Sequence, residues 1–401
     1  MEKNKKWPIF YYYLFIGIGV SNLGNWIYLI ALNVFVWHLT NSAAAVAGIY
    51  IVGPFTRIIC NFFVGSIIDR RNKKTIVVMA DIFRGLFVCL MPFAQSVGTI
   101  YFLLIVTNIA TSFFGPSSTA LISSLVKTED RLRFNSILST LSSGAFMIGP
   151  ALGGIIIKFS SISMAMWVNS FTFIICALFL QLLPYIATSK IKEEKRLFQT
   201  LKEDYQLVYN YAKEIPIFSK FLLLYSIALM ITFALDSQEV TFLLSILSIS
   251  DDLYGITVTV AGIGAVVGGI VATAFATKYS ISSYIKVGFF LTLVSYLIFY
   301  SSPSYLVAVI SFITLGFFMA FSNSGYATYY QESIPVNIMG RFTSIVNLIQ
   351  SALQVLFTMI IGFLADIFSL QLVTISFAMI GVIISIGICK LKIEMKLVGK
   401  E

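Results

Sequence analysis

Apolar segments of membrane-spanning length recur along the whole chain, separated by short polar or Gly/Pro-containing gaps. A helix needs roughly 20 apolar residues to cross about 30 Å of hydrocarbon, and every backbone polar group in lipid must find an internal partner. The segments that approach or exceed this length cover residues 9–37, 43–68, 75–94, 98–125, 135–158, 163–184, 218–247, 254–277, 284–301, 304–331, 342–366 and 371–389. We therefore predict an all-α membrane protein with twelve transmembrane helices.

Composition agrees with this pattern and also predicts an orientation. The chain is 58% hydrophobic and only 11% charged, with a mean hydropathy of +0.91, so it has too few polar groups to cover a water-facing surface. All but three of its 27 Lys and Arg residues lie in the termini, in the loops that follow even-numbered segments or within three residues of those loops; the exceptions are Arg57, Arg84 and Lys158. The positive-inside rule then places both termini in the cytoplasm. The net charge of +9 is a topological signal, and we expect no nucleic-acid partner.

The longest polar gap divides the chain into two parts. Within residues 185–217, apolar residues at helical spacing predict an amphipathic helix that ends near Pro216. We expect a six-helix half over 1–184, a cytoplasmic linker over 185–217 and a second six-helix half over 218–401. A shift of 208 residues aligns "RFNSIL" (133–138) with "RFTSIV" (341–346), and Gly154 with Gly362. A parallel repeat of two such halves resembles the major facilitator architecture, with a substrate path between the halves.

The loop after the second segment, "GSIIDRRNKK" (65–74), resembles the loop signature of that superfamily. Asn72 stands where the signature has Gly, and Asn tolerates a left-handed turn better than most residues. The resemblance implies a cytoplasmic gate; a plain positive-inside loop is the alternative. The implied gate residues are Gly65, Asp69, Arg70, Lys73, Lys74, Asp81 and Arg84. Asp81 and Arg84, three residues apart in "ADIFRG", should face protein, either as a helix-internal ion pair or as part of a charge relay.

The fifth segment contains "GPALGG" (149–154), which resembles the motif of exporters in the superfamily. The resemblance assigns a tight, bendable helix contact to Gly149, Pro150, Gly153 and Gly154. Small-residue packing alone would explain the glycines but not the proline. Because the proline is part of the exporter motif, we favour export over import. With "LGNWIYLIAL" (23–32), the chain resembles the branch of macrolide-efflux and enterobactin-exporter-like proteins of bacterial cytoplasmic membranes. Asn25 replaces an acid often found in that branch, so no proton site is expected there.

Two acids stand out in the seventh segment, in "ITFALDSQEVTFLL" (231–244). Asp236 and Glu239 lie three residues apart near the centre of the predicted span, so they should share a helix face. An ionised carboxylate at this depth costs on the order of 3 kcal/mol, and two this close cannot both ionise cheaply. We expect the pair to carry protons, with Arg57 as the basic partner. The alternative is a permanent structural contact with Arg57 or with hydroxyl groups of the tenth segment.

The resemblance also implies a cargo cavity lined by the first, fourth, seventh and tenth segments. The remaining polar and aromatic residues there are Asn22, Asn25, Trp26, Tyr28, Asn33, Asn108, Thr111, Ser112, Asn323, Tyr326 and Tyr330. Aromatic surfaces with amides and a few acids suit a large, partly apolar molecule, drug or siderophore in type. Each of these side chains could instead serve helix packing.

These observations predict a proton-coupled exporter of amphipathic small molecules. The rival hypotheses are an importer of the same fold, a lipid or glycolipid flippase, and a membrane sensor that transports nothing. An enzyme is disfavoured because no nucleophile with its base, metal cluster or phosphate-binding loop is recognisable. We expect no cofactor and no metal. The expected partners are cargo, protons and the lipid bilayer, and the expected state is a monomer.

Overall fold

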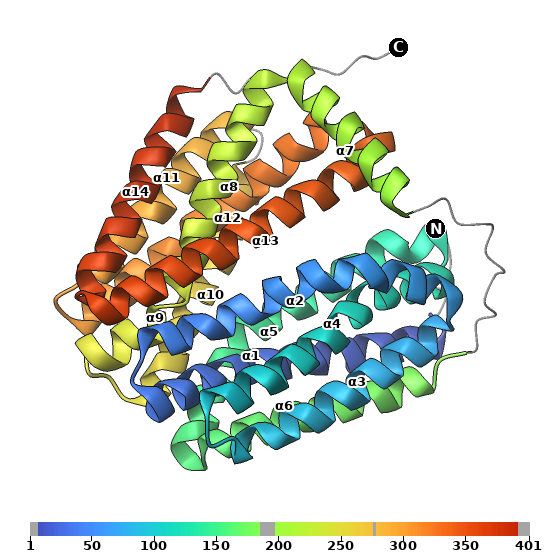
Figure 1. The fold of residues 1–401 in the computed structure, drawn as a ribbon, viewed down its shortest axis with the longest axis horizontal. Coiled ribbons are helices and arrows are strands. Elements are labelled where there is room, and N and C mark those ends of the chain that lie inside the picture. Colours follow the sequence, from blue (N-terminus) through green and yellow to red (C-terminus); the bar gives the residue numbers. More distant parts are fainter. Residues whose placement is uncertain (1–6, 185–196, 276–277, 392–401) are drawn as a thin grey trace. The chain divides into compact units, whose positions relative to one another are not determined.

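The computed structural model describes residues 7–184, 197–275 and 278–391, and these residues fold almost entirely into helices (Figure 1). Twelve of the described helices are long and apolar enough to cross a membrane. The prediction of an all-α, multi-pass membrane protein is therefore confirmed.

The first six long helices closely follow the predicted segments. Their bounds are α1 Ile9–Thr40, α2 Ala43–Arg70, α3 Lys73–Leu90, α4 Val97–Leu125, α5 Arg131–Phe159 and α6 Ile162–Gln181. Serine caps explain why two of them begin where they do. The hydroxyl oxygens of Ser96 and Ser161 accept hydrogen bonds from backbone N–H groups three residues later, at 3.2 and 3.1 Å. Each cap satisfies a donor that the helix itself leaves free.

The remaining helices include one outside the predicted spans and one interrupted span. Their bounds are α7 Leu197–Glu214, α8 Pro216–Asp236, α9 Glu239–Thr241, α10 Asp251–Ala274, α11 Ile281–Tyr300, α12 Tyr305–Ser333, α13 Val336–Ile367 and α14 Leu370–Lys390. A π-helical turn, Phe242–Ile246, follows α9 directly.

The chain forms two compact units. Unit 1 comprises residues 1–41, 55–191 and 250–259, and unit 2 comprises 42–54, 192–249 and 260–401. Helices α2 and α10 are each divided between the units. The start of α2 belongs to unit 2, and the start of α10 belongs to unit 1.

In unit 1, α1 packs against α5 and α6, and α3 packs against α4 and α6. The core near the start of α1 is aromatic. Phe15 stacks on Phe134 of α5 with ring centroids 4.4 Å apart, and Tyr11 packs edge-on against the same ring. The Tyr11 hydroxyl also accepts a hydrogen bond from the backbone N–H of Lys127, at 3.0 Å, which holds the chain between α4 and α5 against α1.

In unit 2, α11 packs against α12 and α14, and α8 packs against α13 and α14. Its core contains Phe218, Phe221 and Tyr225 of α8. Tyr225 stacks almost parallel on Tyr326 of α12, with ring centroids 4.4 Å apart, and its hydroxyl lies 3.1 Å from the hydroxyl of Ser322. Aromatic rings thus join α8 to α12.

Helix α7 stands where the periodicity of the linker predicted an amphipathic helix. Val208 is buried in the core of unit 2. The Tyr211 hydroxyl donates a hydrogen bond to the carbonyl of Ser333, at 2.7 Å. Burial, and secondarily the charge of Glu214, raise the pKa of Tyr211 above its ordinary value, so the hydroxyl keeps the proton that it donates. Helix α7 is therefore docked on unit 2.

Candidate functional site

The two acids of the seventh span lie at an interruption in the helix. Asp236 is the last residue of α8, Ser237 and Gln238 form a turn, and Glu239 begins α9. The prediction that both acids lie near the centre of one continuous helix was wrong. The 21 residues of α8 rise about 30 Å, which is the thickness of the hydrocarbon core. Asp236 therefore lies at the far end of the membrane-spanning helix from Pro216.

Two buried tyrosines of α11 hold this interruption in place. The Tyr296 hydroxyl donates a hydrogen bond to a carboxylate oxygen of Asp236, and the Tyr300 hydroxyl donates one to the carbonyl of Leu235. The Leu235 carbonyl also accepts the backbone N–H of Gln238, at 2.9 Å, so Tyr300 adds a second donor to a carbonyl at the end of α8. Asp236 and Glu239 themselves are partly buried. The sequence alone offered no signal for either tyrosine contact.

The turn between the acids is itself polar and fully buried. Ser237 and Gln238 both have 0% exposure, and the Gln238 amide donates to the Ser237 hydroxyl at 3.1 Å. The Ser237 hydroxyl donates to the carbonyl of Ala234 at 2.6 Å. Two acids and two neutral polar side chains thus lie within four consecutive residues at the end of α8.

The predicted basic partner of the acids is placed in the other unit. Arg57 belongs to the part of α2 within unit 1, and its side chain is exposed. Within unit 2, Asp236 has the hydroxyl of Tyr296 as a neutral partner. The pairing of Arg57 with the acids stays a prediction.

A further carboxylate caps the start of α2 within unit 2. Asp366, at the end of α13, accepts hydrogen bonds from the Ser42 hydroxyl at 2.6 Å and from the backbone N–H of Ala43 at 2.8 Å. An acid is favourable at this position because a helix N-terminus carries partial positive charge. Sequence reasoning missed Asp366, since its partner lies more than 300 residues away.

The start of α10 is held within unit 1 by one Lys–Asp ion pair and one His–Asp contact. The Lys158 ammonium lies 2.8 Å from a carboxylate oxygen of Asp252, and His38 Nε2 lies 2.9 Å from a carboxylate oxygen of Asp251. The shift of 208 residues pairs Lys158 with Asp366. The ends of α5 and α13 therefore each hold the start of a helix, one with a cation and one with an anion.

The loop with the superfamily signature is short and capped. Helix α2 ends at Arg70 and α3 begins at Lys73. Asn72 has φ −66° and its side-chain oxygen accepts a hydrogen bond from the backbone N–H of Thr75, at 3.3 Å. Asn72 therefore does not need the left-handed conformation that Asn tolerates, because this residue serves as the N-cap of α3.

The structure describes the side chains of only some charged residues in that loop. Lys74 donates a hydrogen bond to the carbonyl of Leu183, at 2.6 Å, and so ties the start of α3 to the end of α6. Lys73 is half-buried. The side chains of Asp69 and Arg70, and the surroundings of Gly65, lie outside the described part of the structure, so their gating role stays a prediction.

Asp81 and Arg84 form a buried ion pair within α3, with side-chain exposures of 0% and 5%. The Arg84 guanidinium lies between two rings, 4.1 Å from the centroid of Phe114 and 4.4 Å from that of Phe173. Each contact places the cation over the negative face of a ring. The expectation that both charges face protein is confirmed, and the geometry is that of a helix-internal ion pair.

The "GPALGG" residues form close contacts on two sides of α5. A Cβ added at Gly149 would lie 2.5 Å from the Cβ of Trp26, and one at Gly153 would lie 3.1 Å from the carbonyl oxygen of Ile27. These glycines bring α5 against α1. A Cβ at Gly154 would lie 2.5 Å from the carbonyl oxygen of Asp252, so this position brings α5 against the start of α10.

Several predicted cavity residues of unit 1 donate hydrogen bonds to other groups of the protein. Asn33 is fully buried and its amide donates to the Tyr254 hydroxyl at 3.1 Å, so we assign it to helix packing instead of the cavity. Asn108, Thr111 and Ser112 each donate to carbonyls of their own helix, at 2.9 Å. Their donor groups are thus engaged locally.

The other residues of the predicted cavity set on α1 are partly buried. Asn22 donates to the Ser142 hydroxyl at 3.0 Å, and Trp26 packs against Phe146 with ring centroids 4.6 Å apart. Asn25 and Tyr28 are half-buried along the same helix, and the buried Tyr28 oxygen has no hydrogen-bond partner among the described residues.

In unit 2, the predicted cavity residues lie on one stretch of α12. Asn323 is exposed, whereas Tyr326 and Tyr330 are half-buried. The Tyr330 hydroxyl lies 3.0 Å from the Thr343 hydroxyl. Gln350 of α13, which sequence reasoning did not select, donates to the Ser226 hydroxyl at 3.0 Å. Aromatic rings and amides therefore occur together in unit 2, and their role in lining a cargo cavity stays a prediction.

Comparisons with known proteins agree with this architecture. The Major Facilitator Superfamily profile matches residues 14–358. The putative bacilysin exporter BacE of Bacillus subtilis (strain 168) is 26% identical over 97% of this chain and 94% of its own length. The uncharacterized MFS-type transporter YfiS of the same organism is 25% identical over 66% of this chain and 63% of its own length. Multidrug resistance protein 2, also from Bacillus subtilis (strain 168), is 25% identical over 58% of this chain and 57% of its own length.

Solved structures show the same fold. A bacterial homologue of the human lysosomal transporter Spinster superposes with a TM-score of 0.74 at 14% identity, covering 96% of this chain and 97% of that chain. The nucleoside transporter NupG superposes with a TM-score of 0.72 at 14% identity, covering 95% of this chain and 98% of that chain. At these identities the likeness concerns the fold alone.

Proposed function

Because the chain belongs to the Major Facilitator Superfamily of membrane transporters, we propose that it exports amphipathic small molecules in exchange for protons. The observation that carries this proposal is the pair Asp236 and Glu239 at the interruption after α8, beside the buried hydroxyl of Tyr296. Two partly buried acids three residues apart cannot both ionise cheaply, which suits the pair to hold and exchange one proton. Reversible protonation is what coupling to a proton gradient requires.

The energy available from one proton is sufficient for accumulation of cargo. One charge moved through 100 mV is worth about 2.3 kcal/mol, and each unit of pH difference adds about 1.4 kcal/mol. Together they support a cargo gradient of roughly a hundredfold to a thousandfold per proton. A single exchangeable site at Asp236 and Glu239 is therefore enough for the proposed reaction.

The direction and the class of cargo rest on motif and likeness. The "GPALGG" sequence in α5 resembles the exporter motif, and two relatives are named as a putative bacilysin exporter and a multidrug resistance protein. Rings and amides of the predicted cavity set, such as Trp26, Tyr326 and Asn323, suit partly apolar cargo. We place the chain near the macrolide-efflux and enterobactin-exporter-like branch. Import or lipid flipping by the same fold are the alternatives.

The topology belongs to the same proposal. Both termini face the cytoplasm of a bacterial-type cell, and the halves 1–184 and 218–401 are joined by the linker 185–217 at that face. A monomer is sufficient for transport. With this orientation, the interruption after α8 lies toward the outer face, where an imposed gradient supplies protons to an exporter.

The test uses the full chain in proteoliposomes to which amphipathic cations such as ethidium are added. A pH gradient should drive accumulation of cargo by the wild type. The double variant Asp236→Asn/Glu239→Gln should exchange cargo down its gradient yet fail to accumulate it against one, since it keeps the binding residues but has no exchangeable proton. Glu332→Gln serves as the matched control, because Glu332 is an exposed carboxylate of the same unit.

Each alternative predicts a different result. Accumulation of cargo by the double variant would show that Asp236 and Glu239 have a structural role only. Accumulation in the opposite direction would identify an importer. Movement of labelled lipid between leaflets without movement of any cation would favour the flippase.

A further inference from the structure

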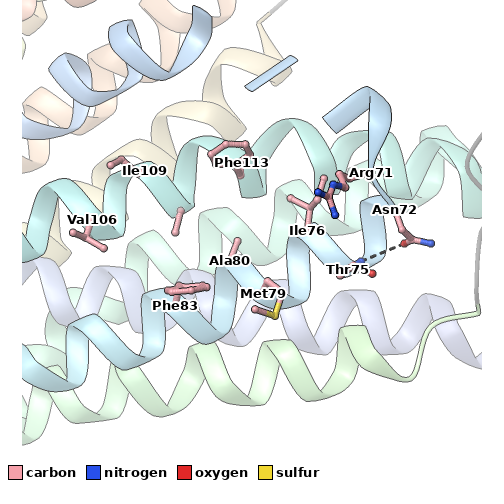
Figure 2. Close-up of a pocket in the computed structure, with 11 residues that line it drawn as sticks. Arg71, Asn72, Thr75, Ile76, Met79, Ala80, Phe83, Val106, Ile109 and Phe113 are labelled. Carbon is pink, nitrogen blue, oxygen red and sulfur yellow. Dashed lines mark hydrogen bonds between the residues drawn. The ribbon is translucent and has the colours of Figure 1, made fainter. Parts of the chain in front are cut away.

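A cavity of about 600 Å³ runs between α3 and α4 in unit 1, separate from the candidate site (Figure 2). Its size falls in the range of small-molecule binding sites. Figure 2 shows Arg71, Asn72 and Thr75 at one end of the cavity and Phe83 with Val106 toward the other. The lining is therefore polar at one end and apolar along the rest of its length.

The apolar part of the cavity is open to the surroundings of the helices. Met79 and Phe83 are each 46% exposed, and Ile109 is 40% exposed. Both α3 and α4 are long and apolar enough to cross a membrane, and exposed apolar side chains on such helices suit contact with hydrocarbon. On the inner side, Ile76 and Phe113 pack against a buried cluster of α2, formed by Cys60, Val64 and Ile68. The cavity is thus a groove lined largely by exposed apolar side chains of two membrane-spanning helices.

The length of the groove matches one leaflet of a bilayer. Arg71 and Phe83 are twelve residues apart, which corresponds to about 18 Å along a helix. Half the hydrocarbon core measures about 15 Å. A ligand whose polar group lies at Arg71 can therefore extend an apolar chain past Phe83 to about the middle of the bilayer.

The positive charge at the polar end of the groove favours a ligand with an anionic group. Arg71 lines the groove, is exposed, and lies in a segment with Arg70, Lys73 and Lys74. A guanidinium binds phosphate oxygens through paired hydrogen bonds, and basic pockets between transmembrane helices attract anionic headgroups. We infer that this groove binds one anionic phospholipid, with its phosphate at Arg71 and an acyl chain along Met79, Phe83 and Ile109.

The experiment measures lipid binding to the full chain by native mass spectrometry from detergent micelles. Dioleoyl-phosphatidylglycerol should bind about tenfold more tightly than dioleoyl-phosphatidylcholine, because only the first has a net negative headgroup for Arg71. Arg71→Gln should remove most of this preference. Lys220→Gln is the control, because it removes an exposed cation at the start of α8 in the other unit and should preserve the preference.

A second variant tests the apolar part of the groove. Ile109→Trp should fill it and weaken dioleoyl-phosphatidylglycerol binding several-fold, whereas Ile263→Trp, at a 46% exposed position of α10, should not. Equal binding of both lipids, or equal loss in Arg71→Gln and Lys220→Gln, would overturn the inference. Displacement of the lipid by inorganic phosphate would show a plain anion site, and displacement by transported cations would assign the groove to cargo. Either result would also overturn it.

Discussion

Replacement of Gly154 by alanine should destabilise the protein, because α5 and the start of α10 leave no room for a methyl group. The new Cβ would lie 2.5 Å from the carbonyl oxygen of Asp252, 3.3 Å from its carbonyl carbon and 3.4 Å from its Cα. All three are backbone atoms, so no side chain can rotate away. Overpacking typically costs about 1–3 kcal/mol, and the higher helix propensity of alanine offsets up to about 1 kcal/mol. We expect a net loss of about 1–2 kcal/mol.

The assay is the thermal unfolding midpoint of the purified chain in detergent, compared with a matched substitution in the same helix. A Cβ at Gly144 would meet nothing within 4 Å, so Gly144→Ala should unfold at the same temperature as the wild type or higher. Gly255→Ala changes the opposite side of the contact, since its Cβ would lie 2.4 Å from the Pro150 carbonyl oxygen, and it should resemble Gly154→Ala. Equal midpoints for Gly154→Ala and Gly144→Ala would refute the close-contact interpretation.

Three further substitutions probe the charged groups. Asp81→Asn leaves the buried Arg84 cation without its anion, which typically lowers the free energy of unfolding by about 3–5 kcal/mol. An unfolding midpoint equal to that of the wild type would show that the rings around Arg84 are enough to stabilise the cation. Asp69→Asn should slow transport at unchanged membrane insertion, measured as initial uptake per inserted protein, and normal uptake would remove the gating role. Tyr296→Phe removes the donor to Asp236 and should reduce uphill accumulation more than downhill exchange; equal reduction of both would indicate a role in folding only.

The number and approximate bounds of the membrane-spanning helices could be predicted from sequence, because length and hydrophobicity alone decide whether a segment can cross a bilayer. The interruption after α8 could not. Ser237 and Gln238 are neither Gly nor Pro, and they lie in an apolar run, so the sequence has no ordinary helix-breaking signal there. The features found at the break are tertiary contacts with α11. The Tyr300 hydroxyl donates a hydrogen bond to the Leu235 carbonyl, and the Tyr296 hydroxyl donates one to Asp236.

Individual polar residues show the same limit. Asp81 and Arg84 were correctly expected to face protein, because two charges within a span are too costly to face lipid. Asn33 was expected in the cavity, yet it bonds Tyr254, whose position more than 200 residues away cannot be inferred from local spacing. Asn72 was interpreted through the glycine of a family signature, whereas its actual role as an N-cap follows from its place immediately before α3.

The central claim is that Asp236 and Glu239 carry the proton that drives export. The most direct measurement follows the lumenal pH of proteoliposomes as amphipathic cations are added, with wild type, Glu332→Gln and Asp236→Asn/Glu239→Gln compared at equal protein content. Proton movement that depends on cargo in the first two, and that is absent from the double variant while cargo exchange persists, is the predicted result. Cargo-dependent proton movement of wild-type size in the double variant would contradict the claim.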